Sequence, residues 1–509
     1  MKSNYTSSIA GAAILITLIS ILGKGFGFFR EAVFAAYYGL STEFDLYLVG
    51  AVIPIAINTI ILFIAQNIFI PSYNSFKLNN IESVDSFVYK QLRVFFILSL
   101  IIFFLLYYFA TPILKLYQPG ASKDFLQIST NIFRITSITI PFSGIVAICI
   151  SYLQVKYDFK NPALAQLSLN IVIILMIVFF SNTISIYAVP IGFVIGTLIQ
   201  TVYLMGKVKI KVSQIFNFNK TSNISVPISI KSLILITIIE VIAQFFVLVD
   251  RFFFLKVDQG GIASLNYALN IFSLPMQIFS IALTTAIFPK LAEFYSKDSF
   301  TDFIIIIDKS IRIMVELFLP IAIVLFLWGE LIVKLLFERG RFLTNDTVLT
   351  YNILKILAIS LVFYSIYAIL NKIFYTTNMI FSLVIITIIG ILLKITGNIF
   401  LVEHYLQNGL AMSTTLTYIY FCLVSLIVLK IKKIYKPNVN LFFLIIANLI
   451  NGLVTLLIIN VIFSLLQFNT IISEVLKLIS FISIFVINLA IYNTLILKSL
   501  TYFKLSKYR

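Results

Sequence analysis

The sequence predicts an all-α polytopic membrane protein, and three observations support this fold class. Of the 509 residues, 61% are hydrophobic and only 11% are charged, with a mean hydropathy of +1.06. Such a composition leaves too few polar side chains to cover a water-soluble protein of this size. The apolar residues form runs that reach the roughly 20 residues a helix needs to cross a bilayer. Basic residues gather in the short segments between these runs.

The apolar runs are continuous, which favours helices over a β-barrel, whose strands alternate in and out over roughly ten residues. We expect about fourteen spans on the basis of bilayer thickness. In chain order they are 8–28, 43–67, 91–110, 131–153, 163–180, 185–206, 229–250, 261–288, 310–336, 349–371, 378–402, 409–430, 440–465 and 473–497.

The basic residues predict the orientation of these spans. Loops on the N-terminal side, such as 207–220 and 430–436, hold most of the 37 lysines and arginines together with the C-terminal tail. Because cytoplasmic loops carry an excess of Lys and Arg, both termini are expected in the cytoplasm. The net charge of +17 is therefore attributed to topology and not to nucleic-acid binding. Binding of anionic lipid headgroups is the alternative interpretation of these clusters.

No catalytic or metal-binding motif occurs in the sequence. It contains neither the phosphate-binding pattern G-x-x-x-x-G-K-[ST] nor the zinc-binding pattern H-E-x-x-H. Cys149 and Cys422 are expected to be packing residues, and His404, the only histidine, to lie at an interface. We therefore expect no enzyme, no cofactor and no metal. The energy source of a transport cycle stays open between an ion gradient, the membrane potential and consumption of the substrate on the far side.

Charged residues at the first two spans are candidate ligand-binding residues, because a charge at the bilayer centre costs at least about 2.5–3.5 kcal/mol. Lys24, Arg30 and Glu31 lie in or at the end of the first span, and Asp45 opens the second. Gly23, Gly25 and Gly27 lie close to Lys24 in the chain and let a headgroup approach the helix. The group suits an anionic, phosphate-bearing ligand. Alternatively, the charges reach to the membrane interface and the glycines only pack helices.

A second polar group begins in span seven with Glu240 and includes Lys394 and Asn398 of span eleven. We predict that Glu240 and Lys394 form a buried ion pair, since each is otherwise an isolated charge in hydrocarbon. A structural ion pair and a coupling site fit this pattern equally well.

The segment G-K-G-F-G-F-F-R-E-A at 23–32, followed by Gly39, Asp45 and Pro54, resembles the MurJ/MviN lipid II flippases of the MOP flippase superfamily. The loop containing Phe337, Gly340 and Phe342 is similar to the F-x-x-G-x-F loop of that family. Other similar stretches follow in the same order along nearly the whole chain.

The resemblance implies an N-lobe at 1–228 with spans one to six and a C-lobe at 229–436 with spans seven to twelve, around a central cavity. Residues 437–509 would hold spans thirteen and fourteen, which form a groove for a polyprenyl tail, and a cytoplasmic tail. The protein would lie in the bacterial cytoplasmic membrane. Its implied partners are an undecaprenyl-linked saccharide lipid, membrane lipids and enzymes of cell-wall or polysaccharide synthesis.

The resemblance also assigns a substrate-binding set. Lys24 stands where the family usually has an arginine, while Arg30 and Asp45 match family residues directly. Asn58 and Asn270 stand at the positions of two cavity arginines. Because an amide lacks the charged, bidentate fork of arginine, these two changes would weaken the binding of a pyrophosphate.

Some members of the family are thought to hold sodium between spans seven, eleven and twelve. The resemblance places Glu240, Lys394, Asn398 and Thr414 near that region. A lysine ammonium can take the place of a bound cation. In that case, removal of sodium should leave transport unchanged.

Four functions remain open at this point. A flippase for the lipid-linked peptidoglycan precursor is favoured by the order of the motifs and by the fourteen spans. A translocase for another lipid-linked saccharide, of exopolysaccharide or O-antigen type, is favoured by the missing arginines. A multidrug exporter of the same superfamily fits less well, because such proteins usually have twelve spans. A non-transporting membrane scaffold predicts that neutralising Lys24 and Arg30 has no effect.

Overall fold

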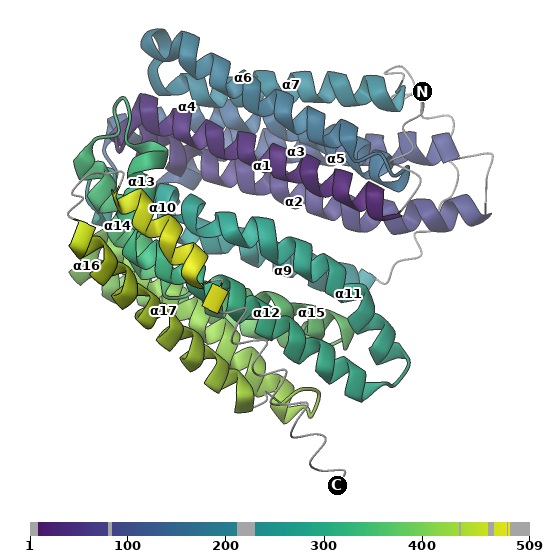
Figure 1. Cartoon of the computed structure of the whole chain (residues 1–509). Coiled ribbons are helices and arrows are strands. Elements are labelled where there is room, and N and C mark those ends of the chain that lie inside the picture. Colours follow the sequence, from purple (N-terminus) through teal and green to yellow (C-terminus); the bar gives the residue numbers. More distant parts are fainter. Residues whose placement is uncertain are drawn as a thin grey trace, which may run out of the picture. The chain divides into compact units, whose positions relative to one another are not determined.

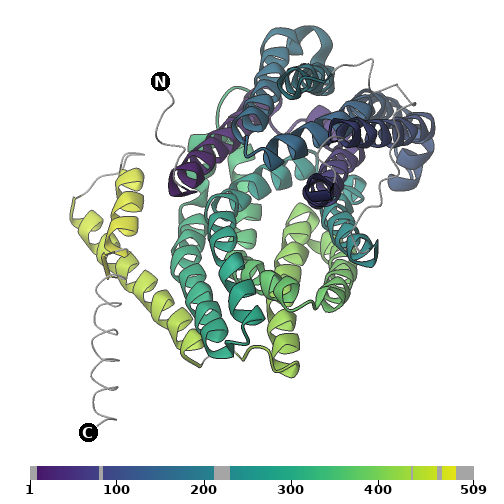
Figure 2. The same ribbon diagram turned by 90° about the vertical axis from the view of Figure 1, so that its right-hand side faces the viewer.

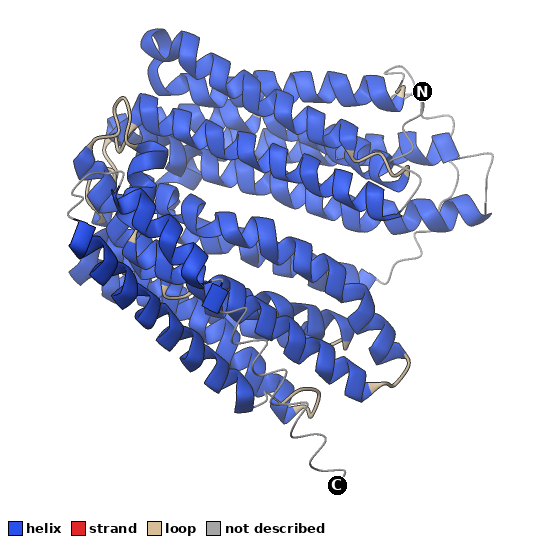
Figure 3. Cartoon of the chain, in the orientation of Figure 1, coloured by secondary structure: helices blue, strands red, loops and turns tan. Residues whose placement is uncertain are grey.

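A computed structural model describes residues 9–79, 84–210, 230–436, 439–466, 473–485 and 487–488. Within these ranges the chain is helical and contains no β-strand (Figure 3). The prediction of an all-α protein is confirmed.

The described residues 9–79 and 84–210 form eight helical elements (Figure 1). They are α1 (Ile9–Tyr38), α2 (Thr42–Asn79), α3 (Val84–Tyr117), α4 (Lys123–Ser137), α5 (Thr139–Val155), α6 (Lys160–Ile184), the short 3-10 turn η3 (Ser185–Tyr187) and α7 (Ala188–Val208).

The second half continues with α9 (Ile230–Arg251), η4 (Phe254–Lys256), α10 (Gly261–Pro275), the π-helical turn η5 (Met276–Ser280), α11 (Ile281–Ser296), α12 (Phe300–Leu327), α13 (Gly329–Phe337), α14 (Thr344–Ala358), α15 (Leu361–Thr376), α16 (Ile380–Ile431) and α17 (Val439–Leu466). A further helical stretch occupies 473–485. Each of the expected apolar runs coincides with one to three consecutive helical elements in the part of it that the structure describes.

By length and hydropathy, seven helical stretches of the described chain can cross a membrane, or eight if the bent pair α14 and α15 is one span. Two of them, Lys160–Val208 with 49 residues and Ile380–Ile431 with 52, exceed the roughly 20 residues of one crossing. Each is interrupted by a non-glycine residue with positive φ, Ser185 in the first and Leu406 in the second. Both stretches are therefore long enough for two crossings.

The two halves of α16 pack against each other as a helical hairpin. A Cβ added at Gly390, before the break, would lie 2.1 Å from the ring of Phe421, after the break. Only a residue without a side chain allows this close approach. The single long helix therefore corresponds to the two separate spans expected at 378–402 and 409–430.

Contacts divide the chain into two compact units. The first consists of Met1–Tyr267, Phe337–Asp346 and Lys394–Leu410, and the second of Ala268–Leu336, Thr347–Leu393 and Ala411–Arg509. The expected lobes at 1–228 and 229–436 stay predictions.

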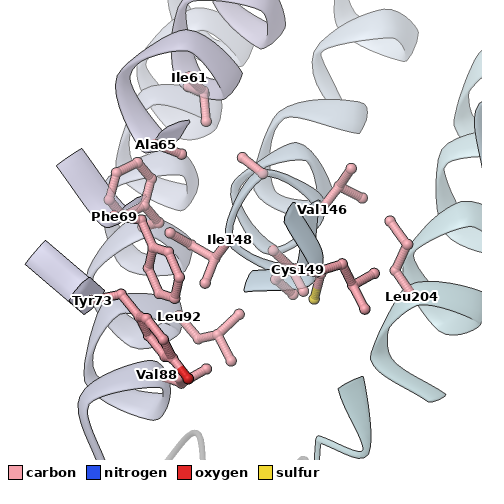
Figure 4. Packing of buried hydrophobic residues seen from close by; sticks show 14 of the residues in the cluster. Ile61, Ala65, Phe69, Tyr73, Val88, Leu92, Val146, Ile148, Cys149 and Leu204 are labelled. Atoms are coloured by element: carbon pink, nitrogen blue, oxygen red, sulfur yellow. The ribbon is translucent and has the colours of Figure 1, made fainter. Parts of the chain in front are cut away.

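The first unit contains a core of buried side chains from α2, α3 and α5 (Figure 4). Phe69 and Tyr73 of α2 lie with their ring centroids 5.7 Å apart, and Phe69 also contacts Phe87 of α3 at 5.5 Å. Cys149 of α5 is completely buried in this core and forms no disulfide, which agrees with its expected packing role.

The second unit has a smaller core where α17 and the stretch 473–485 pack against the end of α12. It is formed by Trp328, Ile459, Phe481 and Phe485. Figure 2 shows this C-terminal helix pair in the yellow-green to yellow part of the colour range. Gly452 of α17 lies so close to α12 that an added Cβ would be 2.6 Å from the Ile323 side chain.

Candidate functional site

Arg30 is held in place by neighbours within the first unit. Its Nη2 forms an ion pair with Glu31 Oε1 at 2.6 Å, and its Nη1 donates a hydrogen bond to Asn170 Oδ1 of α6 at 3.2 Å. The guanidinium also lies over the rings of Phe34 and Phe193, 5.4 and 5.5 Å from their centroids. These contacts fix its orientation before any ligand arrives.

The charge of Arg30 is still partly available. Its side chain remains 20% exposed. An arginine has five N–H donors, so the contacts made here leave donors for an anion. Lys24 lies in the same helix, six residues earlier, but its side chain is outside the described residues.

Asp45 caps a helix. Its Oδ2 accepts the backbone N–H of Gly260 at 2.8 Å, and its Oδ1 accepts that of Ala263 at 2.6 Å. These groups lie at the N-terminus of α10, where backbone N–H groups have no partner within the helix. The carboxylate is completely buried. The structure therefore gives Asp45 the role of bonding α2 to the start of α10, and not that of an exposed cavity carboxylate.

The two asparagines at the positions of family arginines lie in different surroundings. Asn58 donates from Nδ2 to Thr139 Oγ1 at 2.7 Å, and its Oδ1 is buried without a partner among the described residues. Asn270 is half-buried on α10 and belongs to the second unit.

Lys394 and Asn398 of α16 together surround one carboxylate of α9. Lys394 Nζ forms an ion pair with Asp250 Oδ2 at 2.8 Å, and Asn398 Nδ2 donates to Asp250 Oδ1 at 3.1 Å. The ammonium also lies 3.6 Å from the ring centroid of Phe246. The side chains of Lys394 and Asp250 are only 1% and 3% exposed. The cation and the anion therefore compensate each other away from both water and lipid.

The prediction that Lys394 pairs with Glu240 is wrong. Glu240 accepts a hydrogen bond from Gln244 Nε2 at 2.7 Å, one turn further along the same helix. Asp250 lies ten residues after Glu240, which corresponds to about 15 Å along α9. Asp250 is the last residue of the expected span 229–250, and the sequence analysis did not identify it as the partner. Thr414 is buried in the second unit, and its Oγ1 has no partner among the described residues.

The residue after Asp250 carries a second buried charge that sequence reasoning did not place in a site. Arg251 donates from Nη1 to Ile262 O at 3.3 Å and from Nη2 to Asn266 Oδ1 at 3.2 Å. Its carbonyl accepts a hydrogen bond from Gln118 Nε2. Arg251 therefore bonds the end of α9 to the first turns of α10.

The loop with Phe337, Gly340 and Phe342 has a structural role in the first unit. Phe337 and Phe342 are buried, with ring centroids 5.0 and 5.5 Å from that of Tyr267. Gly340 has a φ of +60°, and an added Cβ would lie 2.2 Å from Ala36 O. Only glycine fits both the conformation and the space. The motif therefore fixes the loop against the end of α1.

Comparison with known proteins identifies a family for this arrangement. The family model described as "Lipid II flippase MurJ" matches residues 34–494. The chain is 27% identical over 425 residues to a "Probable lipid II flippase MurJ" of Buchnera aphidicola subsp. Schizaphis graminum, covering 80% of this chain and 81% of the relative.

Two solved structures are similar in fold. One is described as "Lipid II flippase MurJ, inward closed conformation", with a TM-score of 0.78, 23% identity, and coverage of 95% of this chain and 100% of that chain. The other is an inward-facing multidrug resistance MATE family transporter of the MOP superfamily, with a TM-score of 0.67, 13% identity, and coverage of 82% and 98%. At these identities the likeness shows the fold.

Proposed function

Because the chain belongs to the MurJ family of lipid II flippases, we propose that it moves lipid II, the undecaprenyl-pyrophosphate-linked peptidoglycan precursor, across the bacterial cytoplasmic membrane. The observation that carries the proposal is the family match over most of the chain. The headgroup of this lipid is charged and cannot cross hydrocarbon unaided, whereas its tail can stay in lipid. Alternating access around a cationic site would move the headgroup while the tail remains in the bilayer.

Arg30 is the proposed anchor for the pyrophosphate. Its orientation is set by Asn170 and Glu31, and part of its side chain remains exposed. A pre-oriented guanidinium binds phosphate oxygens by short, charge-assisted hydrogen bonds. Lys24, on the same helix, is the second proposed cation of this site.

A small apolar pocket supports the proposed groove for the polyprenyl tail. It has a volume of about 380 Å³ and is lined by α17 and by Asn488, with Phe443, Ile446 and Val454 among the α17 residues. Its surface is mostly apolar, as an isoprenoid chain requires.

Lys394 supports a cycle that does not use sodium. Its ammonium already neutralises Asp250 and is fixed by the protein itself. To bind the Asp250 carboxylate, a free sodium ion would have to displace the Lys394 ammonium, which is part of the chain itself. We therefore propose that the energy comes from a source other than a sodium gradient.

The charge distribution supports cytoplasmic N- and C-termini. In that orientation α1 begins on the cytoplasmic side and ends at Tyr38 on the outer side. The enzymes that polymerise the exported precursor are proposed partners on that outer side, and surrounding membrane lipids are partners along the spans.

A second candidate function is translocation of another lipid-linked saccharide. One observation favours it: Asn58 replaces a family arginine and its amide is already bonded to Thr139. One phosphate-binding fork is thereby lost, so a cargo with fewer charges would be accepted more easily.

Conditional complementation tests the proposed cargo and site together. A bacterium whose own lipid II flippase is depleted would express wild type, Arg30→Ala, Lys24→Ala or the control Lys256→Ala at matched membrane levels. Lys256 is exposed and is not part of the proposed site. Rescue by wild type and Lys256→Ala alone supports lipid II transport through the cationic site. Rescue by all four keeps the cargo and rejects the site, whereas failure of well-expressed wild type rejects lipid II.

A further inference from the structure

A second polar pocket, with a volume of about 340 Å³, lies within the first unit where three helix connections meet. Tyr37 lies in the last turn of α1, Glu43 lies in the first turn of α2, and Arg341 comes from the loop after α13. The last turn of α6 and the start of η3 supply Ser181, Asn182 and Ser185. The volume is at the small end of the roughly 300–1,000 Å³ of small-molecule pockets.

The walls of this pocket are fixed by hydrogen bonds among its own residues. Ser185 Oγ donates to Glu43 Oε2 at 2.8 Å, and Tyr38 Oη donates to the carbonyl of Ser185 at 3.1 Å. Arg341 N donates to Ala36 O at 2.8 Å. Ser185 has a φ of +50° and a ψ of −135°, a conformation that persists in a non-glycine residue only when its surroundings impose it. The pocket is therefore formed before any ligand binds.

Several polar groups in the pocket have unused bonding capacity. Ser181 Oγ is buried and has no partner in the described part of the chain. The Arg341 guanidinium forms no ion pair and no hydrogen bond with described residues, and Glu43 receives only the one bond from Ser185. Buried polar atoms in native proteins are almost always hydrogen-bonded, so Ser181 Oγ indicates a ligand, while Glu43 and Arg341 are exposed and keep their charges available to it.

The pairing of charges restricts the class of ligand. Glu43 and Arg341 line the same pocket but form no ion pair with each other. A phosphate would be repelled by Glu43, a divalent cation would be repelled by Arg341, and a neutral sugar would form an ion pair with neither. A ligand with separate positive and negative ends satisfies both.

We propose that this pocket binds a zwitterionic amino-acid or short-peptide group. The ligand carboxylate binds the Arg341 guanidinium, the ligand ammonium binds Glu43, and Ser181 Oγ hydrogen-bonds to the peptide. α1 passes from the N-terminal side to Tyr38, so the pocket lies at the membrane face opposite the N-terminus.

The physiological ligand rests on the proposed function. Peptidoglycan precursors carry a peptide, and this outer face is where the headgroup arrives after translocation. Free peptide on the outer side has the same chemistry, and the experiment separates the two sources.

Calorimetric titration of the purified full-length protein with triglycine tests the pocket. Triglycine with both ends blocked, which lacks both charges, is the matched probe. We expect triglycine to bind at least about tenfold more tightly than the blocked peptide, since charge-assisted hydrogen bonds are lost with the end groups. Equal binding of the two peptides, or no binding of triglycine, overturns the proposal.

Substitutions locate the binding. Arg341→Gln and Glu43→Gln should each weaken triglycine binding about tenfold, while Lys256→Gln, at an exposed lysine outside the pocket, should not change it. Glu43→Gln retains an oxygen that accepts the Ser185 hydroxyl, so it preserves the fold of the pocket. An unchanged affinity in both pocket variants, with unfolding midpoints like that of wild type, overturns the assignment.

The outcomes separate this pocket from the proposed cargo. Rescue in the depletion strain without triglycine binding rejects the pocket and keeps the function, whereas triglycine binding without rescue keeps the pocket and rejects lipid II. Displacement of triglycine by lipid II, but not by a lipid-linked saccharide without peptide, assigns the pocket to the precursor's peptide. Absence of displacement assigns it to free peptide.

Discussion

The first unit contains two charged clusters whose cations differ in burial and in how completely they are paired. Lys394 is 1% exposed and is matched with Asp250, Asn398 and the ring of Phe246. Arg30 is 20% exposed, and its contacts use only part of its five N–H donors. A cation that the protein compensates completely stabilises the fold, whereas one that it compensates only partly keeps binding capacity. This difference separates a structural charge from a ligand-binding one within one membrane protein.

The largest loss of stability should come from removing one charge of the buried cluster of Lys394, Asp250 and Asn398. Lys394→Met leaves Asp250 as an unpaired buried carboxylate, and removal of one partner from a buried pair costs about 3–5 kcal/mol. We expect a steep fall in the unfolding midpoint of the detergent-purified protein, measured by intrinsic fluorescence on heating.

The double variant Asp250→Asn/Lys394→Met is the matched control for this prediction. It removes both charges, so most of the lost stability should return. A single variant as stable as wild type would show that the ion pair is not buried as described.

A smaller loss of stability is expected for substitutions of Asp45, because its carboxylate is bonded to backbone N–H groups and not to a charged side chain. Asp45→Ala leaves the N–H groups of Gly260 and Ala263 without an acceptor, at a cost of about 1–3 kcal/mol. Asp45→Asn retains one acceptor oxygen and should lose less. The same heating experiment ranks the two variants, and an alanine variant more stable than the asparagine variant would contradict the capping role.

Arg30→Ala should lower stability less than Lys394→Met does, because its ion pair with Glu31 is more exposed than that of Lys394 with Asp250. Its expected effect is on function, with loss of rescue in the depletion strain. Arg30→Lys keeps the charge without the bidentate fork and should rescue partially. If Arg30→Ala lowers the unfolding midpoint as far as Lys394→Met does, the proposed difference between a structural cation and a ligand-binding cation is wrong.

Replacement of sodium by choline should have no effect at all. The ammonium of Lys394 already occupies the position next to Asp250, so transport in vesicles should proceed at an unchanged rate. Lys394→Asn removes that ammonium and provides the sharper comparison. If a cation can replace the ammonium, sodium should raise the unfolding midpoint of this variant and not of wild type. A sodium requirement of wild-type transport would refute the prediction.

The helices could be predicted from the sequence because hydropathy and length decide them locally. Helix breaks were harder, since the turns at Ser185 and Leu406 depend on single residues with positive φ that are not glycine. The π-helical turn at Met276–Ser280 directly follows Pro275, which disrupts a regular helix, but the sequence does not predict which type of break results.

The candidate site could be predicted only in part. Arg30 and Lys394 stood out because charges are costly in hydrocarbon. The partner of Lys394 could not be read from the sequence, since Asp250 is 144 positions away and depends on how α9 and α16 pack. One signal was present: Asn398 lies four residues after Lys394 and therefore on the same helical face. Two polar side chains on one face indicate a buried acceptor nearby.

The tight turn between α6 and α7 has a consequence for biosynthesis. Between Lys160 and Lys207 the chain contains no charged side chain, and the reversal takes only the few residues of η3. No hydrophilic loop is available to pull the first helix across before the second is made. The two helices should therefore leave the ribosome and enter the bilayer together as one hairpin, with both lysines remaining on the side of synthesis.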